Sequence, residues 1–567
     1  MNTEILGIAA TFILSVIFAY PLGKYMARVF KGEKLWSDFF SPLERLVFRI
    51  SGIDPNKPMD WKENLKAMLL LNLVFFLWVF LLLLVSQPFL NPMKIKGMEP
   101  TLAFNTAVSF VTNTNIQHYS GETALSYFSQ LFLLMFMQFV SAGTGIAAVA
   151  LLFKGLVQRQ STDIGNFYNL LVKSITRILL PISSVVALIL LLNGVPMNFG
   201  AYPRITTLQG DTVTVATGPA APMIAIKQAG TNGGGWFGTN SAHPFENPNY
   251  LTNMVENYSI IVIAMGLVFS FSFYLRKMKL GFIIAGVMAV FMLTFILLAL
   301  HWEMQGNPEI KAMGISPRNS SNMEGKEVRF GAAASAYWAV TTTSTSSGSV
   351  NSMHDSFMPL SGGILITDMM MNVIFGGVGV GFLNFFIYLV VAVFIAGLMV
   401  GRTPELLGKK IEAKEIKIAA IVLLLHPLLI LLGTAISSHI ASVNPKIGWI
   451  SNPGYHGFSQ MLYEFSSASA NNGSEFAGLN VNSYYWNIID GVVMLLARFI
   501  PIAGPVAIGG LLAKKKTVPE SAGTLRIDSL TFGLVLISVI VIVSALSFFP
   551  ALAVGPVAEY FSMQVKL

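Results

Sequence analysis

The sequence predicts an all-α polytopic membrane protein with ten transmembrane helices: four pseudo-symmetric helix–pore-loop–helix repeats and one extra helix at each end. Three observations predict this fold. Hydrophobic residues make up 54% of the 567 residues and charged residues only 11%, less than half of the roughly 25% usual in globular domains. Ten apolar runs are long enough to cross a bilayer. A cluster rich in Gly, Asn, Thr and Ser recurs four times at a nearly constant period.

The candidate spans were found as runs of about 20 mostly apolar residues. They are 4–23, 65–86, 126–153, 170–193, 255–275, 280–301, 364–400, 417–440, 486–512 and 528–549. The first run has the acidic Glu4 at its start and no small-residue cleavage site after it, so we interpret it as a span and not as a signal peptide. The absence of Cys excludes a disulfide scaffold, a thiolate metal site and a Cys nucleophile.

Basic residues are distributed unevenly between alternate loops. Of 36 Lys and Arg residues, 10 lie on one side, Arg498 lies inside a span, and 25 lie in 24–66, 154–177, 276–279, 402–417 and 514–526. Cationic loops stay in the cytoplasm, so we expect both termini to be extracytoplasmic. The basic residues form short clusters at span ends and no contiguous basic face, so we expect the lipid bilayer as partner and no nucleic acid.

The four outward segments share one pattern: a short apolar stretch, a polar cluster and then a span. The clusters begin near residues 113, 231, 346 and 471, at spacings of 118, 115 and 125. Two spans separate successive clusters, so all four lie on the same face. The expected units are 1–64 (first span and cytoplasmic loop), the repeats 65–169, 170–279, 280–416 and 417–516, and 517–567 (last span).

Physical limits predict what such a segment can be. Each apolar stretch holds about ten residues, too few to cross the hydrocarbon, and the polar cluster cannot face lipid. We therefore expect four re-entrant loops, each preceded by a half-helix whose negative dipole end favours a cation near the bilayer centre. The clusters offer uncharged oxygens, which favour a large monovalent cation over a divalent one. Ordinary external turns are the alternative, and they explain one cluster better than four.

Six motifs extend over nearly the whole chain: Thr112–Gln117, Gly230–Pro248, Val350–Phe357, Phe375–Gly381, Phe394–Glu405 and Asn471–Ser474. They closely resemble the potassium-binding, channel-like subunit of bacterial potassium-transporting P-type ATPases, the KdpA family, within a superfamily of potassium transporters. The resemblance implies a potassium filter at Asn113, Thr114, Asn115, Gln117, Thr231, Asn232, Gly233, Ser346, Ser347, Gly348, Asn471, Asn472 and Gly473. Many relatives have Cys at the position of Ser347.

The resemblance also implies a function. The chain would bind extracytoplasmic potassium as its substrate in a bacterial inner membrane and pass the ion to a partner, with no cofactor of its own. It has neither a phosphorylatable Asp-Lys-Thr-Gly nor a nucleotide-binding Gly-rich loop, so ATP would be used by the partner. The implied partners are a catalytic P-type ATPase subunit, a single-span accessory subunit and, in many systems, a small lipid-like peptide. The alternative is a freestanding potassium or sodium symporter of the same superfamily, which typically has eight spans.

Two further features indicate gating or coupling. Arg498 is a charge inside a span; it either acts below the filter, where it matches a family arginine, or extends to the headgroups. The run 364–400 is about twice as long as a crossing needs, and its centre contains Gly376, Gly377, Gly379 and Gly381. We expect a broken helix whose loop lies under the filter; a long tilted helix with a Gly packing seam is the alternative.

Two smaller predictions concern the outer face. His118, His243 and His354 each follow a polar cluster, and we expect them to brace the loops and not to bind a metal, because Cys is absent and the carboxylates are scattered in sequence. Potassium is therefore the one metal ion expected. The stretch Thr206–Val215 alternates around a Gln-Gly-Asp turn and predicts a small β-hairpin.

Overall fold

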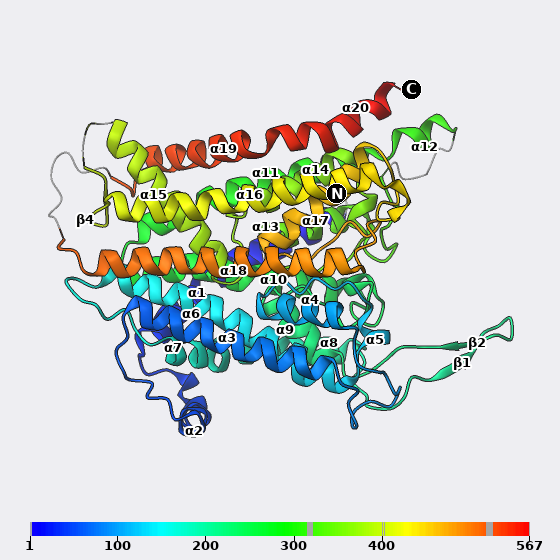
Figure 1. The fold of residues 1–567 in the computed structure, drawn as a ribbon, viewed down its shortest axis with the longest axis horizontal. Helices are drawn as coiled ribbons and strands as arrows, with labels where there is room; N and C mark the ends of the chain where they lie inside the picture. Colours follow the sequence, from blue (N-terminus) through cyan, green and yellow to red (C-terminus); the bar gives the residue numbers. More distant parts are fainter. Residues whose placement is uncertain (1–2, 315–320, 400, 402, 518–525, 566–567) are drawn as a thin grey trace.

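Ten helices in the described part of the chain are long and apolar enough to cross a membrane, which confirms the predicted fold class (Figure 1). The computed structural model describes residues 3–314, 321–399, 401, 403–517 and 526–565. Val400 and Arg402 of the motif Phe394–Glu405 lie outside the described residues, as do 1–2 of the first predicted unit, 315–320 of the third repeat, and 518–525 and 566–567 of the last unit. The spanning helices are α1 (Thr3–Lys31), α3 (Trp61–Leu83), α6 (Phe136–Val157), α7 (Phe167–Ser174) continued by α8 (Leu180–Leu192), α10 (Tyr250–Leu275), α11 (Met278–Gln305), α15 (Val380–Met399), α16 (Ala413–Val443), α18 (Tyr484–Ala513) and α19 (Leu530–Leu552).

Four shorter helices lie between consecutive spans at the positions of the predicted half-helices. They are α4 (Pro100–Val111), α9 (Ala221–Ala229), α13 (Gly331–Ser344) and α17 (Tyr455–Ala470). Their lengths run from 9 to 16 residues, and at 1.5 Å per residue none reaches across a hydrocarbon core of about 30 Å. They are therefore re-entrant pore helices.

The remaining elements are short. The helices are α2 (Ser41–Ser51), α5 (Gly121–Ala124), α12 (Pro308–Ala312), α14 (Pro359–Met371) and α20 (Ala558–Val565). The predicted hairpin forms as β1 (Arg204–Thr206) and β2 (Thr212–Thr214), and it extends away from the helices in Figure 1. A second two-stranded hairpin consists of β3 (Glu405–Leu406) and β4 (Lys409–Lys410).

The two spans of each repeat differ in burial. Within the most apolar window, the span after each pore helix is 78, 78, 67 and 67% buried in α6, α10, α15 and α18. The span before each pore helix is only 22, 39, 39 and 28% buried. The same inner and outer positions thus recur four times, as expected of a pseudo-symmetric bundle whose centre is protein and whose perimeter is lipid.

Sequence-encoded caps fix where several spans begin. Asp60 caps α3: its carboxylate accepts the Glu63 N–H at 2.8 Å, while the Glu63 carboxylate accepts the Asp60 N–H at 2.9 Å. Asn249 and Thr252 form a capping box of the same kind at the start of α10, and the Ser483 hydroxyl accepts the Trp486 N–H at the start of α18. Each side chain satisfies backbone donors that a helix start leaves without partners.

Both chain ends lie at the end of the bundle from which the pore helices enter (Figure 1). The Glu4 carboxylate accepts the N–H of Ala333 in the first turn of α13, at 3.3 Å. Near the C-terminus, Glu559 of α20 lies 2.8 Å from His456 at the start of α17. The other nitrogen of the His456 ring lies 3.0 Å from Asp355. The terminal helices are therefore tied to the third and fourth pore-loop regions.

The His456 contacts predict a pH-dependent stability. Burial alone would lower the pKa of His456, but its hydrogen bonds to Asp355 and Glu559 outweigh burial and raise the pKa to about 10. Because the folded-state pKa exceeds the unfolded value near 6.5, the stabilisation is complete below about pH 6.5 and is lost as the pH rises through about 10. His456→Gln should cost roughly 1.5–3 kcal/mol at pH 6, measured as a lower melting temperature in detergent.

At pH 10.5 the wild type and His456→Gln should melt at nearly the same temperature. His439→Gln, at an exposed position on α16, provides the matched control and should leave the melting temperature unchanged. An equal loss for His456→Gln at both pH values would contradict a charged His456.

Candidate ion-binding site

The four predicted triplets directly follow the C-terminal ends of the four pore helices. In each, the N–H of the middle residue donates to the carbonyl five residues earlier. The bonds are Thr114 to Ser109 at 2.9 Å, Asn232 to Lys227 at 2.8 Å, Ser347 to Thr342 at 2.9 Å and Asn472 to Ser467 at 2.9 Å. Four different sequences therefore build the same turn, at the negative end of a helix dipole.

The backbone of the triplets repeats as well. The first residues have positive φ: Asn113 62°, Thr231 45°, Ser346 48° and Asn471 52°. So do the third residues: Asn115 55°, Gly233 87°, Gly348 83° and Gly473 99°. The middle residues do not. When the sign of φ alternates from residue to residue in this way, successive carbonyls point toward the same side of the chain. In a β-strand, by contrast, successive carbonyls point to opposite sides. Each triplet can thus present a row of carbonyl oxygens.

The four triplets close into a ring. A Cβ added at the third residue of one triplet would overlap the middle carbonyl oxygen of the next: Gly233 on Ser347, Gly348 on Asn472 and Gly473 on Thr114. Between the first and second triplets, the Asn113 amide donates to the Thr231 carbonyl at 2.9 Å. The predicted convergence of the four loops on one axis is therefore confirmed, and the alternative of separate external turns is wrong.

Side chains around the ring point into the protein. Asn113 accepts a hydrogen bond from Ser141 at 2.9 Å, and Asn115 accepts one from Gln138 at 3.2 Å. The Asn472 amide donates to the Thr342 carbonyl at 2.7 Å. Because these amides are held by the surrounding helices, backbone oxygens are the groups left to face the axis. Ser347 is buried, and its hydroxyl has no hydrogen-bond partner among the described residues.

Gln117 does not lie in the ring itself. Its side-chain oxygen accepts the Gly235 N–H at 2.8 Å, and its amide donates to the Gly235 carbonyl at 3.2 Å. Gln117 therefore joins the first loop to the second, just behind their triplets.

A buried polar network that sequence reasoning missed supports the second triplet. Lys227 in α9 pairs with Glu246 and donates to Asn240 at 2.8 Å. Asn240 in turn donates to the carbonyl of Gly233 at 2.6 Å. The signal in the sequence was Lys227, a charge within an apolar stretch beside a polar motif. Through this ion pair, Glu246 braces the second loop.

The helix break predicted in 364–400 is confirmed: residues 372–379 separate α14 from α15. The loop lies against the second triplet, since the Val378 N–H donates to the Thr231 hydroxyl at 2.9 Å, and against the third, since Asn372 accepts a hydrogen bond from the Ser346 hydroxyl at 3.0 Å. Gly376 and Gly381 pack backbone to backbone, and a Cβ at Gly379, with φ 92°, would overlap the Gly145 carbonyl. The alternative of one long tilted helix is wrong. The role of Gly376, Gly377, Gly379 and Gly381 in gating stays a prediction.

Arg498 is buried in the middle of α18. Its side chain is 3% exposed, and its guanidinium donates to the Ser141 carbonyl of α6 at 3.2 Å. The Ser141 hydroxyl in turn donates to Asn113, so one residue separates Arg498 from the first triplet. This burial contradicts the alternative in which Arg498 extends to the headgroups.

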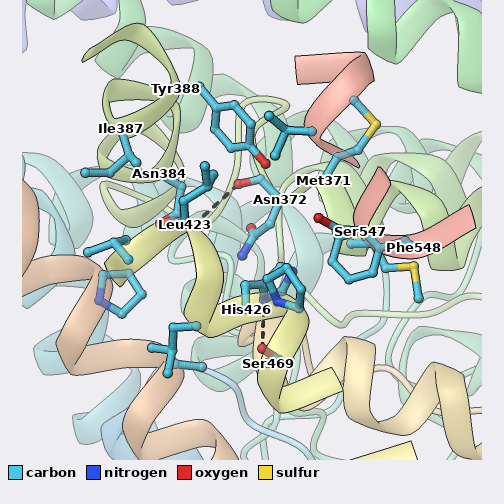
Figure 2. A pocket seen from close by; sticks show the side chains of 17 residues that line it. Met371, Asn372, Asn384, Ile387, Tyr388, Leu423, His426, Ser469, Ser547 and Phe548 are labelled. Atoms are coloured by element: carbon cyan, nitrogen blue, oxygen red, sulfur yellow. Dashed lines mark hydrogen bonds between the residues drawn. The ribbon is translucent and has the colours of Figure 1, made fainter. Parts of the chain in front are cut away.

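A small cavity of about 40 Å³ lies beside the broken helix, between the third and fourth repeats and α19 (Figure 2). Asn372, Tyr388 and His426 line it. Asn372 accepts a hydrogen bond from the Ser346 hydroxyl at 3.0 Å, so the cavity lies one residue away from the third triplet.

The three outer histidines differ in their surroundings. His243 stacks on Phe237 with ring centroids 3.9 Å apart, and His354 contacts the Tyr463 hydroxyl at 2.8 Å, so both brace loops as predicted. His118 also braces a loop, because its Nδ1 lies 2.7 Å from the side-chain oxygen of Asn487 in α18. That His118 binds no metal stays a prediction, and carboxylates that are scattered in the sequence converge on it in the fold. Glu464, Glu475 and Asp490 lie beside this imidazole.

Ten spans and a ring of four re-entrant loops define a multi-pass membrane protein of the pore-loop class. The family model for the potassium-transporting ATPase A subunit (KdpA) matches residues 9–561. The chain belongs to this family.

Three relatives have sequences similar to this chain over nearly its full length. The potassium-transporting ATPase potassium-binding subunit of Flavobacterium psychrophilum is 54% identical over 100% of both chains. The protein of that name from Bacteroides thetaiotaomicron is 54% identical over 99% of this chain and 100% of its own. The one from Alicyclobacillus acidocaldarius is 46% identical over 98% of this chain and 99% of its own.

Proposed function

We propose that this chain is the potassium-binding, channel-like subunit of an ATP-driven potassium uptake complex. It takes potassium from outside a bacterial inner membrane and passes the ion to a P-type ATPase subunit. The observation that carries the proposal is the ring in which four triplets with the same alternating backbone contact one another through their carbonyls. The names of its relatives, all potassium-binding subunits of a potassium-transporting ATPase, support the same function.

The chemistry of the ring fits a potassium ion. A monovalent ion that sheds its water needs several oxygens to replace the hydration shell, and backbone carbonyls supply them without a fixed charge. No Asp or Glu occurs in the four triplets, so the ring has no carboxylate to favour a divalent ion. The four helix ends that point at the ring add partial negative charge, which stabilises a cation there.

Two groups below the ring would control how the ion leaves. The loop 372–379 lies against the second and third triplets and obstructs a straight path inward. Arg498 places a positive charge near the first triplet, where it repels a cation that moves inward. Both features suit a subunit that holds an ion until a partner accepts it.

The proposed partners are a catalytic P-type ATPase subunit, a single-span accessory subunit and a small lipid-like peptide. Both termini would be extracytoplasmic, because the basic loops lie on the face opposite the pore helices. The extra spans α1 and α19, one at each end of the four repeats, favour the pump subunit over a symporter with eight spans.

Coexpression tests this function. In a bacterium without other potassium uptake, this chain with its partner subunits should restore growth at low potassium and take up rubidium tracer. The chain alone should not, nor should a complex whose ATPase subunit lacks its phosphorylatable Asp. Uptake by the chain alone would contradict the proposal and favour the freestanding symporter.

A further inference from the structure

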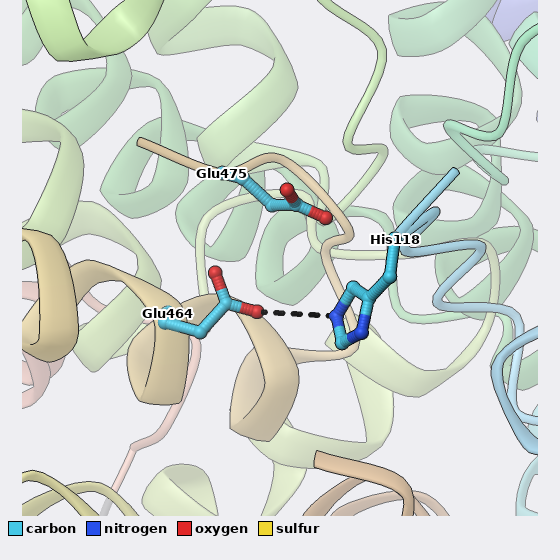
Figure 3. A group of neighbouring side chains, drawn as sticks. All are labelled: His118, Glu464 and Glu475. Atoms are coloured by element: carbon cyan, nitrogen blue, oxygen red, sulfur yellow. Dashed lines mark ion pairs between the residues drawn. The ribbon is translucent and has the colours of Figure 1, made fainter. Parts of the chain in front are cut away.

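Three ionisable side chains from different parts of the chain, His118, Glu464 and Glu475, converge in one place (Figure 3). A fourth, Asp490, lies beside His118. His118 follows the first triplet, Glu475 follows the fourth, Glu464 lies in α17 and Asp490 in α18. The side chains of His118, Glu464 and Asp490 are fully buried, and Glu475 is partly accessible. The cluster therefore joins the first and fourth pore loops near the outer surface.

The orientation of His118 directs a lone pair into this cluster. Its Nδ1 lies 2.7 Å from the side-chain oxygen of Asn487, which can only accept a hydrogen bond. The Asn487 amide is used on the Thr101 hydroxyl at 3.2 Å, which fixes which end of Asn487 faces the imidazole. Nδ1 therefore carries the proton, and Nε2 of the neutral imidazole is a free ligand atom. Metal-binding histidines are held in this way.

The atoms that face Nε2 have no hydrogen-bond partners. Both carboxylate oxygens of Glu464, both of Asp490 and Nε2 of His118 are buried and have no hydrogen-bond partner within the described part of the chain. Their closest charged contacts are the long ones between His118 and the two carboxylates. Buried polar atoms are normally hydrogen-bonded, and a group of them without partners points to a bound ion or water that the chain itself does not supply. No Lys or Arg among the described residues forms an ion pair with Glu464, Glu475 or Asp490.

The distances fit one shared ion. His118 Nε2 lies 3.7 Å from Asp490 Oδ2 and 3.9 Å from Glu464 Oε1. Both distances are too long for a hydrogen bond. Ligand atoms about 2.1 Å from one tetrahedral ion lie about 3.4 Å apart, and wider angles lengthen this distance. One ligand atom each from His118, Glu464 and Glu475 lies within 4.8 Å of the other two, so these three can share an ion. Asp490 lies near the imidazole and outside this group of three.

The ligand types indicate the class of ion. Carboxylates alone suit Mg²⁺ or Ca²⁺, but imidazole favours the borderline transition metals. A combination of one imidazole with carboxylates suits Zn²⁺ and Mn²⁺. Two positive charges would also neutralise most of the three carboxylates, which cannot all stay charged and uncompensated in a buried place. Potassium prefers the uncharged oxygens of the ring.

We propose that His118, Glu464 and Glu475 bind one divalent transition-metal ion, Mn²⁺ or Zn²⁺, which links the first and fourth pore loops at the outer edge of the ring, with Asp490 beside the site adding negative charge. This site is separate from the potassium site, and its ion is a resident structural ion that is not transported. The proposal stands whether or not the chain works with an ATPase.

Metal content tests the proposal directly. The purified complex is stripped with a chelator, incubated with MnCl₂ or ZnCl₂ without ATP, desalted, and analysed by mass spectrometry of the elements. We expect the wild type to retain one equivalent of metal ion per chain. For Glu464→Gln we expect an affinity for Mn²⁺ or Zn²⁺ that is at least tenfold lower, measured by repeating the incubation over a range of metal concentrations. Glu122→Gln, an outer-face carboxylate outside the cluster that accepts the Gly238 N–H, is the matched control and should keep the full equivalent.

A second measurement does not depend on any variant. The electron paramagnetic resonance of Mn²⁺ bound to the wild type should show coupling to an imidazole nitrogen, and the bound ion should raise the melting temperature. A wild type that retains neither Mn²⁺ nor Zn²⁺ would overturn the proposal, because water or a shared proton would then fill the cluster. Equal metal in the wild type and Glu464→Gln, or a Mn²⁺ spectrum without nitrogen coupling, would do the same.

Discussion

Replacing Gly233 by Asp is expected to abolish potassium-selective uptake by the assembled complex. Gly233 has φ 87°, and a Cβ there would overlap the Ser347 carbonyl oxygen. A side chain at this position therefore adds backbone strain of roughly 1–2 kcal/mol and displaces an oxygen of the ring. The carboxylate also adds a negative charge among neutral oxygens. Rubidium tracer uptake should fall by more than about tenfold, the factor that corresponds to 1.4 kcal/mol, and discrimination between potassium and rubidium should be lost.

Gly210→Asp is the control that separates the effect of the contact with the ring from the effect of backbone strain. Gly210 lies in the turn of the β1–β2 hairpin with φ 93°, and no atom lies within 4 Å of an added Cβ. The two positions thus share the same unfavourable conformation, but only one contacts a triplet. Normal uptake by Gly210→Asp with loss in Gly233→Asp would support the proposed filter. Normal, selective uptake by both variants would mean that the ion binds elsewhere.

Much of the fold could be predicted because each element leaves a local signal. Spans appear as long apolar runs, and the four pore helices as apolar stretches too short to cross, each followed by a polar cluster. The break in 364–400 followed from Gly residues that a straight helix would not favour. Boundaries were less certain: α3 begins at Trp61, four residues before the predicted start, because the Asp60–Glu63 capping box starts the helix in a charged stretch.

Contacts between distant segments could not be predicted from local patterns. His118 and Asp490 are separated by more than 300 residues, so their proximity depends on how the first repeat packs against the fourth. The same holds for Gln117: a motif placed it beside a triplet, but only the fold shows that its amide bonds to Gly235. Repeats reveal which positions are equivalent, and packing decides which of them touch.

Arg498→Met is expected to reduce ATP-driven uptake without loss of stability. Arg498 is 3% exposed, and its guanidinium donates a hydrogen bond to the Ser141 carbonyl, a neutral acceptor. No carboxylate among the described residues forms an ion pair with it, so its burial costs folding energy of about 3 kcal/mol or more. Removal of an uncompensated buried charge in favour of an apolar side chain of similar length is neutral or stabilising. The melting temperature should therefore stay the same or rise.

The loss of function has a separate electrostatic cause. The guanidinium lies one residue from the first triplet and raises the energy of a cation that moves inward from the ring. Without this charge the ion would no longer be held for the partner, and rubidium uptake by the complex should fall at least about tenfold, the equivalent of 1.4 kcal/mol. Arg498→Lys keeps the charge and should retain more uptake than Arg498→Met. Unchanged uptake in Arg498→Met would exclude Arg498 from coupling. A folded Arg498→Met variant with little uptake would show that this buried charge serves transport and not stability.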